Sequence, residues 1–165
     1  MDKTEALKAK ILKAQEAADI AGLYVLEQEA NELFDDQTLV AYYANILELA
    51  LENLTDALGT ARKMKMADVK DFATLRALYE YAIEHYSAGK PQDAAALFEI
   101  LAGLSDDARF SDAMTRHRQC AERIPDFEQF LDDAADLDAT QRNGTFYISA
   151  FSRDGNELCE EEAPE

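Results

Sequence analysis

Residues 78–110 constrain the fold of this chain most, because they have the pattern of two helices joined by one tight turn. Gly89 stands where a helix C-terminus favours a left-handed backbone, and Pro91 stands where a helix begins and its missing N–H needs no partner. Apolar side chains recur three and four positions apart on both sides of this turn, which places them on one face of each helix. These residues are Leu75, Leu78, Tyr79, Ala82 and Tyr86, then Ala94, Leu97, Phe98 and Leu101. The stretch therefore predicts an antiparallel helical hairpin.

Helical periodicity continues over most of the chain, so the predicted fold class is all-α, built from antiparallel helical hairpins. Helices are expected over 4–19, 20–34, 38–58, 110–124 and 126–137, with Gly22 leaving open whether the first two are one bent helix. The stripe over 38–58 is wide, which predicts burial against more than one neighbour. It consists of Leu39, Tyr43, Ile46, Leu47, Ala50, Leu51, Leu54 and Leu58.

We expect a single helical domain over 1–152, followed by an acidic tail, 153–165, that is expected to be disordered. The residues 145–151 have the composition of a strand but no partner strand in a helical chain. They are expected to pack as an extended arm over the helices, to pair across a dimer, or to form a small hairpin. The expected parts of the domain are N-terminal helices 1–70, the hairpin 71–108, C-terminal helices 109–138 and the arm 143–152.

The charge of the chain excludes several classes of partner. There are 34 Asp and Glu against 16 Lys and Arg, a net charge of −18. Such a surface repels nucleic acid and anionic lipid, and it favours basic partners. No apolar run approaches the length that spans a bilayer, and the N-terminus lacks the apolar core of a signal peptide. We therefore expect a cytoplasmic protein with neither a membrane nor a nucleic acid as partner.

Residues that could carry chemistry are few. Cys120 and Cys159 are far apart and predict neither a disulfide framework nor a metal site. The histidines His85 and His117 have no Ser or Cys nucleophile beside them and are interpreted as packing residues, with an enzyme that uses either of them as a minor alternative. The acidic run 126–138 lacks the oxygen pattern of a calcium loop and is interpreted as a solvated face. The sequence thus predicts no enzyme, no metal and no cofactor.

Four cations follow the longest expected helix. Their simplest interpretation is a helix C-terminus, where positive charge opposes the helix dipole, and the alternative is a docking patch for an acidic partner. They are Arg62, Lys63, Lys65 and Lys70.

The hairpin resembles one tetratricopeptide (TPR) repeat of about 34 residues. The resemblance rests on Leu78, Ala82, Tyr86, Gly89, Ala94, Phe98 and Leu101. It is most similar to the first repeat of the TPR-type (class II) chaperones of bacterial type III secretion, which continue with an Arg-Phe pair like Arg109-Phe110. This resemblance implies a TPR-like right-handed array of helices.

The same resemblance implies a binding groove. Its lining would be Arg76, Tyr79, Ile83 and Tyr86 on the first helix of the hairpin, and Tyr and Arg are frequent binding hot spots. The alternative is that helix 38–58 covers this face. We therefore expect a non-catalytic chaperone or adaptor, with another protein or a peptide as its partner and a role connected with secretion. The alternative function is a structural or self-associating protein, a homodimer formed through residues 145–151.

Overall fold

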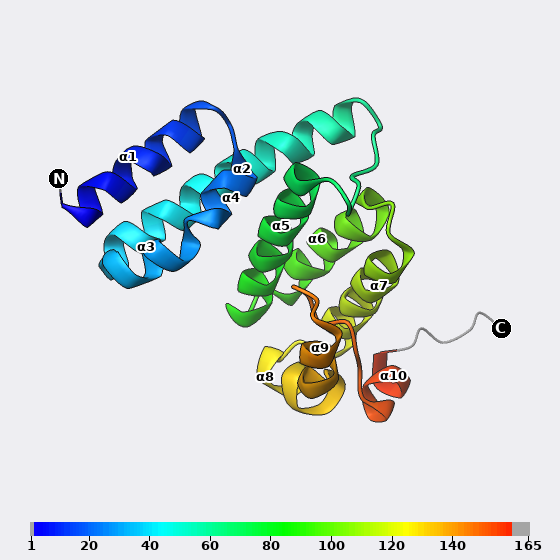
Figure 1. The fold of residues 1–165 in the computed structure, drawn as a ribbon. Helices are drawn as coiled ribbons and strands as arrows, with labels where there is room; N and C mark the ends of the chain where they lie inside the picture. The colour runs from blue at the N-terminus through cyan, green and yellow to red at the C-terminus, as the bar shows by residue number, and fades with distance from the viewer. Residues whose placement is uncertain (1, 160–165) are drawn as a thin grey trace. The chain divides into compact units, whose positions relative to one another are not determined.

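The computed structural model describes residues 2–159, and most of them are helical (Figure 1). No β-strand occurs in that range, so the all-α prediction is confirmed. Contacts group the chain into two compact units, Met1–Ala77 and Leu78–Glu165, where the sequence predicted a single domain over 1–152. The boundary falls inside the helix α5 (Val69–Ser87).

The first unit contains four helices and the first part of α5. An aspartate precedes three of them and accepts a hydrogen bond from a backbone N–H of the first turn, as Asp35 does from Thr38 at 2.7 Å. The range 20–34 forms two helices, which meet at Leu26, rather than one. The four helices are α1 (Lys3–Glu16), α2 (Ile20–Val25), α3 (Glu27–Leu33) and α4 (Asp36–Gly59).

The core of the first unit is built on one face of α4. Tyr42 donates a hydrogen bond to the carbonyl of Leu23 and joins α4 to α2. The buried positions of α4 are Tyr42, Ile46, Ala50, Leu54 and Ala57. This face is narrower than predicted, because Leu51 and Leu58 of the expected stripe are exposed. Only one side of the wide apolar stripe on α4 is therefore buried.

The four cations predicted at a helix end fall mostly in a loop, because α4 ends at Gly59 and α5 begins at Val69. Arg62 donates two hydrogen bonds to Asp71, at 2.9 and 3.2 Å, and the backbone N–H of Lys65 donates a third at 3.0 Å. Burial raises the pKa of Asp71, but these hydrogen bonds outweigh it and hold the pKa below its ordinary value. Asp71 thus fixes the loop to the start of α5.

The second unit begins with the predicted hairpin, which is confirmed. Gly89 has a left-handed backbone with φ of +80°, and Pro91 is the first residue of the next helix. The Lys90 N–H closes the turn on the carbonyl of His85 at 2.9 Å. The further elements are α6 (Pro91–Leu104), α7 (Ala108–Arg123), α8 (Phe127–Gln129), the π-helical turn η1 (Phe130–Ala134), α9 (Leu137–Asn143) and α10 (Arg153–Cys159).

Residues 145–151 lie as an extended segment without strand pairing, apart from one isolated bridge between Ala135 and Phe151. The Asp136 N–H donates to the carbonyl of Ala150 at 3.0 Å. The segment is therefore held inside its own unit. Of the three arrangements expected, it adopts that of an arm packed on the helices.

The prediction of a disordered tail is wrong for residues 153–159, which form α10. Residues 160–165 lie outside the described residues. A disulfide joins Cys159 to Cys120 of α7, so the prediction of unpaired cysteines is also wrong. Gly155 lies against η1, where a Cβ atom would collide with the backbone of Ala134. Sequence spacing could not show this pairing, because the chain between the two cysteines, which are 39 positions apart, folds back on itself.

Candidate functional site

The structure does not keep the predicted groove residues on one open face. Tyr79 and Tyr86 are buried, Ile83 is half-buried, and Arg76 is half-buried in the first unit. The Tyr79 ring contacts His117 of α7, with 5.3 Å between ring centroids, and Phe146 of the arm. The prediction of an open groove lined by the two tyrosines is therefore wrong. Within the second unit its position is filled by α7, η1 and the arm.

A chain of hydrogen bonds fixes the protonation of His117. Its Nδ1 lies 2.6 Å from the carbonyl of Ala113, which can only accept, so Nδ1 carries the proton. Its Nε2 lies 2.9 Å from the Tyr79 hydroxyl and must accept the proton of that hydroxyl. The Tyr79 oxygen accepts in turn from the Ile148 N–H at 3.0 Å. His117 is thus held neutral and ties α7, α5 and the arm together.

We expect the second unit to lose stability between pH 6.5 and 4 through His117. Burial lowers the pKa of His117 from 6.5 to about 4, against a smaller opposing effect of the Ala113 carbonyl. As the pH falls, the unfolded chain protonates His117 before the folded chain does. The contribution of neutral His117 to the free energy of unfolding is therefore fully present above pH 6.5 and is lost as the pH falls toward 4. The loss should reach about 3 kcal/mol, measured by urea unfolding at several pH values.

The matched control is His117→Gln, whose amide can accept from Tyr79 and donate to Ala113 but does not titrate. Because the acidic residues titrate in both proteins, the difference between the two pH profiles isolates the histidine. Two profiles that fall in parallel between pH 6.5 and 4.5 would contradict the assignment.

The other histidine, His85, is half-buried on α5 and lies 2.9 Å from the carbonyl of Tyr81 through its Nδ1. Within residues 2–159, no group of three or more His, Cys, Asp or Glu side chains could hold a metal ion. No hydrogen bond from either histidine to a carboxylate is observed among these residues.

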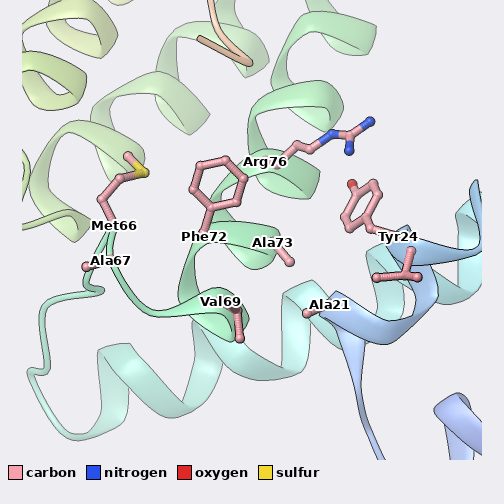
Figure 2. Close-up of a pocket in the computed structure, with 9 residues that line it drawn as sticks. Ala21, Tyr24, Met66, Ala67, Val69, Phe72, Ala73 and Arg76 are labelled. Atoms are coloured by element: carbon pink, nitrogen blue, oxygen red, sulfur yellow. The ribbon is translucent and has the colours of Figure 1, made fainter. Parts of the chain in front are cut away.

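The first unit contains a groove that the sequence analysis missed. It lies between α2 on one side and residues 66–76 on the other, with a volume of about 450 Å³ (Figure 2). The size falls in the range of ligand pockets, 300–1,000 Å³ as a rough guide. Its lining is almost entirely apolar and consists of Ala21, Tyr24, Val25, Met66, Ala67, Val69, Phe72, Ala73 and Arg76.

Arg76 closes one end of this groove and is fixed in place. Its guanidinium lies 4.1 Å from the centre of the Tyr24 ring and donates to both carboxylate oxygens of Glu27, at 2.9 and 3.0 Å. Glu27 also accepts from the Tyr43 hydroxyl at 2.8 Å. This network connects α5 with α2, α3 and α4, while Asp71 holds the loop at the other side. The walls of the groove are therefore preorganised.

Large apolar side chains remain exposed along the groove. The exposed fractions are 80% for Val25, 73% for Val69 and 41% for Phe72. Contiguous apolar surface of this kind marks sites where proteins bind other molecules. The groove can take apolar side chains and offers one aromatic wall, at Phe72, for stacking. Phe72 and Ala73 lie three and four residues after Val69, which puts them on one helical face with it, but periodicity could not show that α2 forms the opposite wall of a groove.

No family model matches this chain, and no curated protein or solved structure matches it either. Within residues 2–159, every helix is too short or too polar to cross a membrane. The resemblance to TPR chaperones therefore remains a prediction.

Proposed function

We propose that this chain is a non-catalytic protein-binding module, an adaptor or chaperone, and that its binding site is the groove between α2 and residues 66–76. The observation that carries the proposal is the preorganised, exposed apolar lining around Phe72. The occupant is an extended segment of a partner protein with one or two aromatic side chains. Basic residues flank these aromatics, because the net charge of −18 attracts positive charge.

A TPR-type relationship and a role in secretion belong to this proposal. What supports the TPR-like arrangement is the α5–α6 hairpin with its left-handed Gly89 and its initial Pro91. The cytoplasmic location expected from the sequence also remains a prediction. The disulfide between Cys120 and Cys159 favours an oxidising compartment instead, because such bonds are rare in the reducing cytosol.

Replacing Phe72 by serine should weaken binding to the groove roughly tenfold or more, because an aromatic hot spot is lost. The probe is a synthetic peptide, acetyl-Lys-Phe-Ala-Phe-Lys-amide, titrated into the labelled protein while backbone amide NMR spectra are recorded. The expected result is a set of shifts at residues 21–25 and 66–76. Phe72 is already part-exposed, so circular dichroism should show an intact fold.

The matched control is Leu12→Ser, an exposed apolar position of α1 in the same unit that lies outside the groove lining. It should bind this peptide like the native protein. Equal affinity of the Phe72→Ser variant, or shifts confined to other residues, would exclude the groove as the site. Tighter binding of uncharged aromatic compounds than of the peptide would indicate a small-molecule site and would count against a protein partner.

A further inference from the structure

The helix α4 has a second apolar stripe besides the one that forms the core of the first unit. Its members are Val40, Leu47, Leu51 and Leu58, spaced seven, four and seven residues apart. At 100° per residue they fall within about 40° of one another, roughly 100° away from the centre of the buried face. Val40 is 69% exposed and Leu58 is 59% exposed. The outer stripe is therefore a separate face of α4.

This outer stripe is long enough to be a binding surface. From Val40 to Leu58 it extends about 27 Å at 1.5 Å per residue, which is five helical turns. Scattered exposed apolar residues are normal on protein surfaces, but aligned ones are typical of an interface. The sequence had predicted that α4 packs against more than one neighbour, and α4 does contact both α2 and α3, but its buried residues all lie on the core face and none lies in this stripe.

The charges around the stripe define the partner. All charged residues of α4 are acidic, namely Asp36, Glu48, Glu52 and Asp56, and all four are exposed. Glu48 lies beside the stripe, at about 80° from its centre, and Glu52 and Asp56 lie further round the helix, at about 120° and 160°. Two copies of α4 that paired along this stripe would bring two helices together whose charged residues are all acidic. A partner with Lys or Arg beside its own apolar stripe would instead neutralise these acidic residues.

We infer that the outer stripe of α4 is a docking surface for a basic amphipathic helix of a partner protein. The helix lays its apolar face on Val40, Leu47, Leu51 and Leu58, as two helices do when ridges pack into grooves. Its cations pair with Glu48 and Glu52 at the rim. This surface shares no residue with the groove around Phe72, so either of the two sites can exist without the other.

The test uses the full chain and a synthetic 18-residue helical peptide with Leu along one face and Lys elsewhere. Binding is measured by fluorescence anisotropy of the labelled peptide. The variant Leu51→Ser/Leu58→Ser should bind roughly tenfold more weakly or worse. Both positions are exposed in the native protein, so circular dichroism should show the native helix content. Leu12→Ser, at an exposed apolar position of α1 outside both the stripe and the groove, is the matched control here and should bind like the native chain.

The charge is tested with Glu48→Gln/Glu52→Gln, which should weaken binding and reduce its dependence on salt concentration. A peptide of the same pattern with Glu in place of Lys should not bind. Equal affinity of the Leu51→Ser/Leu58→Ser variant, or equal binding of a scrambled peptide, would overturn the inference, since charge alone would then explain the binding. A dimer of the native chain that the same variant converts to a monomer would also overturn it, in favour of a second copy as the occupant.

Discussion

Replacing Tyr86 by alanine should destabilise the second unit by about 3–5 kcal/mol, the usual cost of deleting a large buried aromatic side chain. Its side chain is fully buried, and its ring centroid lies 5.2 Å from those of Phe127 and Phe130 and 6.5 Å from that of Phe98. Its hydroxyl donates to the carbonyl of Ile124, the residue that ends α7. Urea unfolding followed by circular dichroism measures the loss.

Two variants separate the parts of this effect. Tyr86→Phe keeps the ring and should cost only about 1–3 kcal/mol, for the carbonyl of Ile124 left without its donor. Tyr81→Ala removes a half-buried tyrosine of the same helix and should cost less than Tyr86→Ala. If the Tyr86→Ala variant unfolded at the same urea concentration as the native protein, the tyrosine would be an exposed binding residue, as the TPR-like interpretation of the sequence predicted.

Reducing the disulfide between Cys120 and Cys159 should lower the free energy of unfolding of the second unit by about 4 kcal/mol. The bond closes a loop with a sequence separation of 39, and the chain-entropy estimate for a loop of that length gives this value. Both cysteines are buried, and α10 contacts both η1 and α7. The measurement is urea unfolding with and without a dithiol reductant.

The matched control is the Cys120→Ser/Cys159→Ser variant, which should resemble the reduced native protein and respond to reductant no further. Two thiols that react with an alkylating reagent in denatured, unreduced protein would contradict the disulfide. The same count made on protein from its native source would also decide between a reducing and an oxidising location.

The sequence predicted the local features of the chain well, because those depend on neighbours a few residues away. The αL turn at Gly89, the start of a helix at Pro91 and the helix expected over 110–124, which is α7, all agree with the structure. The candidate site was predicted poorly. Periodicity placed Tyr79 and Tyr86 on one helical face, but it could not tell whether that face is open to solvent or covered by other segments.

What covers a face depends on residues distant in sequence. Tyr79 is enclosed by His117 and by residues 146–148, about 40 and 70 positions away, and Cys120 meets Cys159 through a chain reversal. The helix α4 shows the opposite error, since Leu51 and Leu58 belong to an apolar pattern that predicted burial and yet both are exposed. The sequence by itself determined the helices, their turns and their apolar faces, through backbone preferences and 3.6-residue periodicity. Only the tertiary structure decided which of those faces are filled, because burial is a property of contacts between segments and not of any one helix.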